Sequence, residues 1–292
     1  MAYLGANMVN NVYPFLPHHS RPGWSLIPSR QQSMLQDLDW DQVEQGLSPT
    51  RTLSNIFWMT LPWQNIRNVL GGKLHVLDVG CGSGDYFDRL QSWTHGMIHS
   101  YRGIDVQERP NWGGLTKTNP QVSFQVIRSL FSASDILPET NLVITQSAIE
   151  HFEFDVLFFR EIRKFVDRIP NPLLQIHLVP SAACLWLYVT HGYRQYTPHT
   201  IDKMTACFSE RDTQKILVPL GGRHCNRLHF SALTLSRLTK GRQADQRKTN
   251  PPLYERQLST AILKDAQRPA QSPSFYAVIL ASHLSLDLRT VK

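Results

Sequence analysis

The stretch that decides the fold reads Leu74-His75-Val76-Leu77-Asp78-Val79-Gly80-Cys81-Gly82-Ser83-Gly84-Asp85. It begins with a short apolar run, which is typical of a strand buried on both faces. Three glycines at alternate positions follow, and apolar residues then recur at helical spacing at Tyr86, Phe87, Leu90 and Trp93. A strand, a glycine-rich turn and a helix in this order predict the first unit of a nucleotide-binding α/β domain.

The glycine pattern distinguishes between two kinds of ligand. A dinucleotide-binding turn follows G-x-G-x-x-G/A, with a small residue at the sixth position. Counting from Gly80, that position holds Asp85, whose carboxylate would repel a pyrophosphate at the start of the helix. The pattern D-x-G-x-G-x-G, with Asp78 at the end of the strand, instead favours a ligand that has an ammonium group and no phosphate.

The segment VLDVGCGSG resembles the first motif of class I S-adenosylmethionine-dependent methyltransferases, of the bacterial small-molecule type. The resemblance implies an S-adenosyl-L-methionine cofactor and a Rossmann-like three-layer α/β/α fold. The implied sheet has seven strands, mostly parallel, and its antiparallel last strand lies beside the fifth. It also implies that Asp78 helps to hold the methionine amino group and that the turn borders the cofactor at Gly80, Cys81, Gly82 and Gly84. The alternative is a glycine turn that serves only packing.

A second strand is predicted over residues 99–106, where Asp105 stands close to its end. Asp105 follows Gly80 by 25 residues, near the offset of roughly 20 at which such folds place a ribose-binding acid. Two acids at the ends of adjacent parallel strands are more specific than one, and they strengthen the methyltransferase interpretation. Asp105 and Val106 are therefore predicted to contact the cofactor. The alternative role of Asp105 is to cap a turn.

The remaining strands supply further predicted contacts. Family members often carry an acid after the third strand that contacts the adenine, but this chain has Arg128, Ser129 and Leu130 there, and we expect Ser129 or backbone groups to make this contact. The fourth strand ends at Gln146 and Ser147, and both are expected beside the cofactor because ligands bind at the carboxyl ends of such strands. The strands from the third to the last are predicted over residues 122–127, 141–147, 173–179, 216–220 and 274–282.

Methyl transfer is an in-line displacement that needs alignment and the exclusion of water, without a covalent nucleophile. For a hydroxyl acceptor a base helps, and His titrates in the right range. His151, which follows the fourth strand, is the first candidate for the base and His191 the second; either can instead be a structural hydrogen-bonding residue. Some relatives carry E-x-x-E-H at this point and bind a divalent cation. Ser147 replaces the first carboxylate here, and no metal is predicted.

The chain is divided into an N-terminal extension over residues 1–50 and a methyltransferase domain over residues 51–292. The domain is predicted to contain an insertion at about residues 221–273. Helices are predicted over residues 31–38, 51–70, 157–166 and 198–208, and the second of them is expected to bring Arg51 and Trp63 near the cofactor. The sequence Asn250-Pro251-Pro252-Leu253-Tyr254 is similar to the N-P-P-Y motif of base-methylating enzymes, but Leu253 interrupts it and we predict a turn.

The amino-acid composition indicates where the protein resides and which partners it can bind. No apolar run approaches the roughly 18 residues that would span a bilayer, and the four cysteines form no CxxC pair, so a cytoplasmic protein with reduced thiols is expected. The net charge is +7, and residues 237–268 hold eight Lys or Arg against three Asp or Glu. Such a segment can attract nucleic acid. A solvated surface is favoured instead, since aromatic residues do not alternate with these charges, as a single-strand platform requires.

Three classes of function follow. The leading one is a methyltransferase that acts on an O or N atom of a small polar molecule, such as a sugar or nucleotide-linked sugar. The aromatic, His, Arg and Tyr residues within residues 185–198 suit a polar, ring-shaped acceptor. The alternatives are an RNA methyltransferase that uses the basic insertion and a cofactor-binding protein without turnover.

Overall fold

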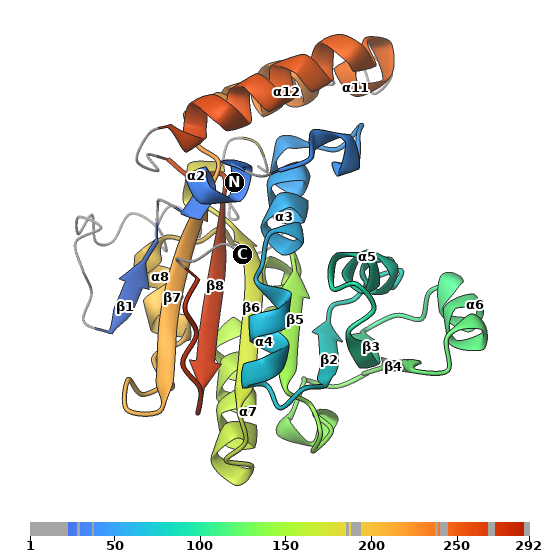
Figure 1. The fold of residues 1–292 in the computed structure, drawn as a ribbon, viewed down its shortest axis with the longest axis vertical. Coiled ribbons are helices and arrows are strands. Elements are labelled where there is room, and N and C mark those ends of the chain that lie inside the picture. The colour runs from blue at the N-terminus through green and yellow to red at the C-terminus, as the bar shows by residue number, and fades with distance from the viewer. Residues whose placement is uncertain are drawn as a thin grey trace.

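A twisted sheet of eight strands runs through the centre of the molecule (Figure 1). The computed structural model describes residues 23–27, 30–36, 38–184, 187, 194–236, 239, 245–267 and 272–288. The strand order is β1-β7-β8-β6-β5-β2-β3-β4. The strands are β1 (Trp24–Leu26), β2 (Leu74–Val79), β3 (Ile98–Asp105), β4 (Val122–Val126), β5 (Leu142–Gln146), β6 (Leu173–Pro180), β7 (Thr213–Leu220) and β8 (Phe275–Ser282).

The predicted fold class is confirmed, with one correction to the strand count. Strand β8 is antiparallel to both of its neighbours, β6 and β7, and the other described pairings are parallel. The predicted seven strands correspond to β2 through β8. The eighth, β1, lies within the predicted N-terminal extension and pairs with β7 at the edge of the sheet. Three residues are too few to produce an alternating pattern, so periodicity could not reveal this strand.

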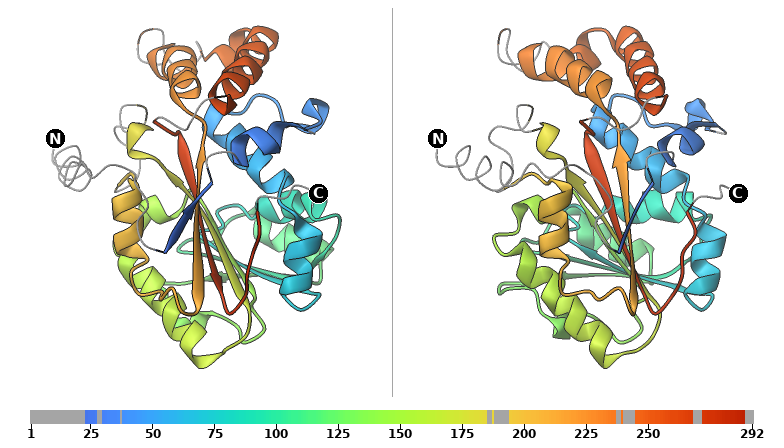
Figure 2. Two further views of the ribbon diagram at one scale, coloured as in Figure 1. Left: turned by 60° about the vertical axis from the view of Figure 1, so that its left-hand side comes forward. Right: turned by 90° about the vertical axis from the view of Figure 1, so that its left-hand side faces the viewer.

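Helices cover both faces of the sheet, as Figure 2 shows in views along its edge. Helices α3, α4 and α5 lie on one face, and α7 and α8 lie on the other (Figures 1 and 2). The helices are α2 (Arg30–Gln36), α3 (Pro49–Met59), α4 (Trp63–Val69), α5 (Tyr86–Trp93), α6 (Asn111–Thr118), α7 (Asp155–Arg168), α8 (Pro198–Met204), α9 (Arg223–Leu228), α11 (Gln246–Thr249) and α12 (Pro251–Ala266). Shorter turns of 3₁₀ helix are η1 (Trp40–Gln42), η2 (Ala133–Asp135), η3 (Ile149–His151) and η4 (Ala182–Cys184), and η5 (His229–Leu235) is a π-helix.

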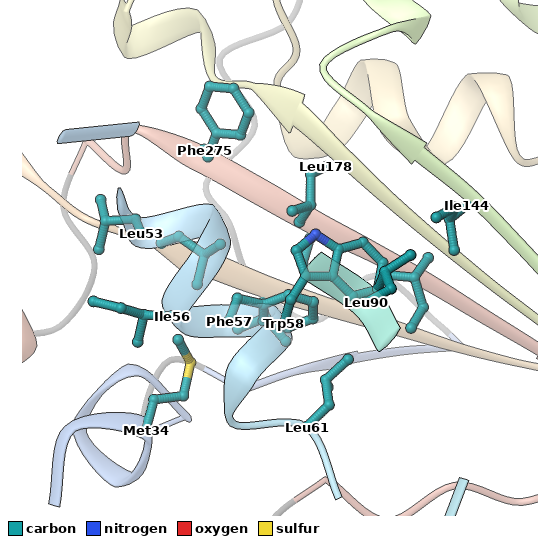
Figure 3. Close-up of a cluster of buried hydrophobic side chains, with 14 of the residues drawn as sticks. Met34, Leu53, Ile56, Phe57, Trp58, Leu61, Leu90, Ile144, Leu178 and Phe275 are labelled. Atoms are coloured by element: carbon teal, nitrogen blue, oxygen red, sulfur yellow. The ribbon is translucent and has the colours of Figure 1, made fainter. Parts of the chain in front are cut away.

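The core consists of two apolar clusters, one on each face of the sheet. Side chains of a strand alternate between them, so Val76 of β2 belongs to one cluster and Leu77 to the other. Strands buried on both faces explain the continuous apolar runs in the sequence. Figure 3 shows part of the first cluster, where Trp58 of α3 lies among side chains that include Ile144 of β5 and Leu178 of β6.

Helix boundaries follow local signals, with two clear differences from expectation. The helix predicted over residues 198–208 ends at Met204. The predicted helix over residues 51–70 is two helices, α3 and α4, separated at Thr60–Pro62. Pro62 precedes the first residue of α4 and lacks the N–H that a continuous helix would need at that point. The start of α8 follows such a signal, because the Thr197 side chain accepts a hydrogen bond from the Thr200 N–H and Pro198 opens the helix.

The described part of the predicted insertion contains α9, η5, α11 and α12, which lie beyond one end of the sheet near α2 and α3 (Figure 1). The turn predicted around Asn250 is wrong, because this residue caps α12. Its side-chain Oδ1 accepts from the Leu253 N–H at 3.3 Å, and Pro251 is the first helical residue. Asn before Pro is a favourable start for a helix, since the missing N–H would be unpaired in any case. The domain boundaries remain predictions.

Two observations bear on the environment of the protein. No helix among the described residues combines the length and apolarity that crossing a bilayer requires. All four cysteines fall within the described ranges, and none of them is in a disulfide. The cytoplasmic location remains a prediction.

Candidate functional site

The glycine turn over residues 80–84 joins β2 to α5, and its three glycines have different surroundings. Their φ angles are +77° at Gly80, +55° at Gly82 and +84° at Gly84. A Cβ on Gly80 would lie 2.5 Å from the Cβ of Ala148, and one on Gly84 would lie 2.6 Å from the ring of Phe124. No atom lies within 4 Å of the Cβ position at Gly82. Packing thus requires two of the glycines, whereas Gly82 leaves free space beside bare backbone.

Hydrogen bonds tie this turn to the end of β3. The N–H groups of Gly80 and Cys81 donate to the same carbonyl oxygen of β3 at 2.7 and 3.1 Å. The Gly82 N–H donates to Asp105 Oδ2 at 2.8 Å, and its carbonyl accepts from Trp112 Nε1 of α6 at 2.9 Å. Both polar groups of Gly82 are therefore fixed from outside the turn. The Cys81 side chain is buried and is not among the residues that line the chambers described next.

A chamber of about 490 Å³ opens at the carboxyl ends of β2, β3, β4 and β5. Its lining includes apolar and aromatic side chains, namely those of Ile127, Leu130, Phe131, Phe152 and Phe158. An apolar chamber with a few polar groups is suited to a flat, ring-containing ligand. It brings together six of the residues predicted to bind the cofactor, namely Gly80, Gly82, Asp105, Val106, Ser129 and Ser147.

Asp105 has more partners than its spacing in the sequence indicated. Besides Gly82, its carboxylate accepts hydrogen bonds from the N–H groups of Val106 at 2.7 Å and Gln107 at 3.3 Å. A carboxylate offers about four acceptor positions, so three backbone donors leave about one for a ligand hydroxyl. Asp105 thus both holds the turn and faces the larger chamber.

A second chamber, of about 160 Å³, lies beside the first. Its lining includes Thr50 and Arg51 at the start of α3, Gln146 at the end of β5, and Ser147 and Glu150 in the segment that follows β5. Ser147 lines both chambers, so the two are adjacent at this residue. Its φ of +52° places it in the left-handed region, which is uncommon outside glycine and is concentrated at functional sites.

A tryptophan of helix α3 fixes the side chain of Gln146. Its side-chain Oε1 accepts from Trp58 Nε1 of α3 at 2.8 Å, while its buried Nε2 has no hydrogen-bond partner among the described residues. The amide therefore keeps its NH2 group available as a donor in the smaller chamber. Of the two side chains expected near the cofactor, Arg51 lines this chamber, whereas Trp63 stacks on Trp58 at 6.1 Å between ring centroids and lines neither chamber.

Known proteins resemble this chain only distantly. No family model and no curated protein sequence matches the chain. Among solved structures, plantazolicin methyltransferase BpumL, in complex with a triazolic desmethylPZN analog and SAH, is 16% identical, with a TM-score of 0.46 over 87% of this chain and 95% of that one. Coclaurine N-methyltransferase bound to N-methylheliamine and SAH is 11% identical, with a TM-score of 0.43 over 96% and 92%. The cyclopropane synthase MmaA2 from Mycobacterium tuberculosis is 17% identical, with a TM-score of 0.40 over 75% and 83%. At such values these likenesses concern only the fold.

The sheet itself decides the fold family. The predicted antiparallel last strand is β8, beside the fifth predicted strand, β6, and the glycine turn follows the strand at the centre of the parallel part. The fold is the Rossmann-like three-layer α/β/α fold. In this fold the two chambers lie at the ligand-binding ends of the parallel strands, where Ser147 follows β5.

Glu150 is a site residue that the sequence interpretation did not single out. It is 1% exposed and lines the smaller chamber. Burial raises its pKa to about 8, and a hydrogen bond from its own backbone and the charge of Arg51 offset only part of this effect. Its Oε2 has no hydrogen-bond partner among the described residues. The sequence did hold a signal for this residue, the Glu150-His151 pair after the fourth strand, but only His151 was predicted as a base.

Of the two histidines predicted as the base, the structure describes only His151. His151 is exposed and lines the larger chamber, alongside Asp105 rather than Glu150. His191 lies outside the described residues. His177 is fully buried, which lowers its pKa to about 3 and keeps it neutral. Within the described ranges, no three His, Cys, Asp or Glu side chains are grouped closely enough to hold a metal ion.

Asp78 lies behind the turn and lines neither chamber. It is 1% exposed, and Tyr101 donates its hydroxyl to Oδ2 at 2.6 Å. Burial raises the pKa of Asp78 to about 7, and the nearby Asp105 adds to the rise. Its role at the methionine amino group remains a prediction.

Proposed function

We propose that this protein is a methyltransferase that uses S-adenosyl-L-methionine, with the adenosine part in the larger chamber and the methionine part toward the smaller one. The observation that carries the proposal is a mainly apolar chamber, which Gly82 lines with an open Cβ position, and a polar chamber that shares Ser147 with it. A ligand with an apolar ring system at one end and charged groups at the other fits this pair of chambers.

The residues present fit each part of the cofactor. The free acceptor position of Asp105 suits a ribose hydroxyl, and Val106 and Ser129 stand where the adenine would lie. At the other end, the Gln146 amide suits the polar methionine atoms. Arg51 suits their carboxylate because a guanidinium is a strong partner for that group. The wider set of proposed cofactor residues also contains Asp78, Gly80, Cys81, Gly82, Gly84 and Ser147.

The cofactor supplies a methyl group bound to a positively charged sulfur, and the protein aligns an acceptor with it and excludes water. We infer an O or N atom of a small polar molecule as the acceptor, such as a sugar or nucleotide-linked sugar. The polar side chains of the smaller chamber support this class over a lipid tail.

One observation favours a second candidate, an RNA methyltransferase. The described part of the insertion has exposed basic side chains on α9, α11 and α12, namely Arg223, Arg227, Lys248, Arg256 and Lys264. Such a surface attracts a phosphate backbone, and its binding would weaken steeply with salt. A third candidate is a protein that binds the cofactor without turnover.

Incubation with methyl-labelled S-adenosylmethionine and a cell extract tests these candidates. After the reaction the extract is separated into small molecules, RNA and protein, with a Gly82→Val variant as the control for label transferred by other enzymes. We expect label in the small-molecule fraction only with the unmodified chain. Label in RNA would favour the second candidate, and its absence from every fraction would favour binding without turnover.

A further inference from the structure

The smaller chamber contains one carboxylate among its described lining residues, that of Glu150. The side chain is almost completely buried, yet its Oε2 has no hydrogen-bond partner among the described residues. Leaving a buried polar atom unpaired is costly, and native proteins seldom do so without a functional reason. The atom is therefore available to a ligand in the chamber.

The groups around Glu150 come from three elements. Arg51 faces it from α3, but its Nη1 already donates to the Tyr86 hydroxyl at 2.8 Å. Tyr196, before α8, is near enough to be influenced by the charge of Glu150, and its hydroxyl donates to Asp155. The next residue, His151, lines the other chamber. Glu150 therefore keeps a free oxygen although charged and polar groups surround it.

Burial raises the pKa of Glu150 to about 8. At neutral pH the Glu150 carboxyl group is thus mostly protonated. A cation placed beside it would favour the carboxylate and lower this pKa again, because opposite charges stabilise one another. Glu150 can therefore exchange one proton with a ligand near neutral pH, which is the property of an efficient general base.

We propose that Glu150 binds the protonated amine of the acceptor and removes its proton, so that the methylated atom is a nitrogen. This inference rests on the proposed function, because it requires a methyl donor at the junction of the chambers. An amine suits this carboxyl group better than an alcohol does, since an ammonium proton is far more acidic than an alcoholic one.

The step balances in atoms and charge. The Glu150 carboxylate takes one N–H proton from the ammonium, and the nitrogen keeps the electron pair of that bond. This pair forms the new N–C bond to the methyl group, and the electron pair of the broken S–C bond goes to the sulfur, which becomes neutral. The products are a methylated ammonium ion, the neutral thioether S-adenosylhomocysteine and a protonated Glu150, which later releases its proton to water.

Binding of two cofactor analogues tests the inference without knowledge of the acceptor. S-adenosylhomocysteine lacks the methyl group, whereas sinefungin carries an amine on the carbon that replaces the sulfur. We would titrate both into the unmodified chain and into Glu150→Gln by calorimetry between pH 6.5 and 9. The control is Glu139→Gln, an exposed glutamate that lines neither chamber.

The unmodified chain and the control are expected to bind sinefungin at least about tenfold more tightly than S-adenosylhomocysteine, which is about 1.4 kcal/mol. Glu150→Gln should keep its affinity for S-adenosylhomocysteine and lose this preference. Repeating the titrations at pH 7 in buffers of different ionisation enthalpy should show that sinefungin releases more protons than S-adenosylhomocysteine from the unmodified chain, but not from Glu150→Gln.

Two results would overturn the inference. One is an unmodified chain that shows no preference for sinefungin. The other is a Glu150→Gln variant that loses affinity equally for both analogues, which would assign Glu150 to the methionine part of the cofactor. If the unmodified chain binds neither analogue, the proposed function itself fails.

Discussion

Replacing Gly82 by valine separates a ligand-binding glycine from a merely structural one. Gly82 has a φ of +55° and no atom within 4 Å of its Cβ position. Gly96, in the turn after α5, has a φ of +78° and equally open surroundings, but it lines neither chamber. Gly82→Val and Gly96→Val therefore introduce the same side chain into the same backbone region, and they differ in their distance from the proposed ligand.

The expected magnitudes follow from this geometry. A side chain in the left-handed region costs roughly 1–2 kcal/mol, so both variants should lose about that much free energy of unfolding, with no clash to add to it. A ligand at 100 times its Kd adds about 2.7 kcal/mol of stability to the folded state. S-adenosylhomocysteine should supply this to the unmodified chain and to Gly96→Val, and nothing to Gly82→Val, whose side chain occupies the space of the ligand.

Thermal unfolding with and without S-adenosylhomocysteine measures both effects in one experiment. The reasoning is refuted if the ligand stabilises Gly82→Val as much as Gly96→Val, because the space at Gly82 would then have no part in binding. Unfolding of Gly82→Val at all temperatures would instead show that the turn tolerates no side chain. The affinity of Gly82→Ala, measured by calorimetry, would then decide the question.

Two further substitutions test the acids at the strand ends. Asp105→Asn should weaken S-adenosylhomocysteine binding at least about tenfold. The NH2 group of the amide would face the N–H of Gly82 or Val106, and two donors cannot bond to each other. If calorimetry finds the affinity unchanged, Asp105 has no part in binding. Asp78 has its pKa raised from 3.8 to about 7 in the folded state, so the folded chain retains a proton that the unfolded chain loses, and this group makes stability fall as pH rises from about 4 to about 7. In Asp78→Asn the side-chain carbonyl can still accept from Tyr101, but the pH-dependent contribution disappears. As pH rises from about 4 to about 7, thermal unfolding should therefore show the variant gaining stability relative to the unmodified chain, and above pH 7 the difference should stay constant. A difference that is constant over the whole range would contradict the assignment.

The central unit of the fold could be predicted because its signals are local. The strand before Gly80 is a continuous apolar run, and only glycine readily adopts the three positive φ angles of the turn that follows. The position of Asp105 followed from its spacing, which the regular length of a strand-helix-strand unit fixes. The start of α8 was equally local, with a cap and a proline side by side at Thr197 and Pro198.

The rest depended on contacts between distant parts of the chain. The hydrogen bond from Gly82 to Asp105 joins residues 23 positions apart, and no pattern in either segment announces it. The burial of Glu150 results from the packing of α3 across the carboxyl end of β5, where Trp58 reaches Gln146. Since adjacent residues of the short helix η3 face different chambers, the sequence could not tell which of Glu150 and His151 lies with the polar groups.

A calorimetric titration of the unmodified chain with S-adenosylhomocysteine, with NAD as the comparison ligand, tests the central claim most directly. Two chambers that share Ser147 in their linings predict one S-adenosylhomocysteine molecule bound per chain. NAD should give no binding heat and should leave the S-adenosylhomocysteine affinity unchanged, because the Asp85 carboxylate at the start of α5 repels a pyrophosphate. Binding of NAD, or no binding of S-adenosylhomocysteine, would contradict the account.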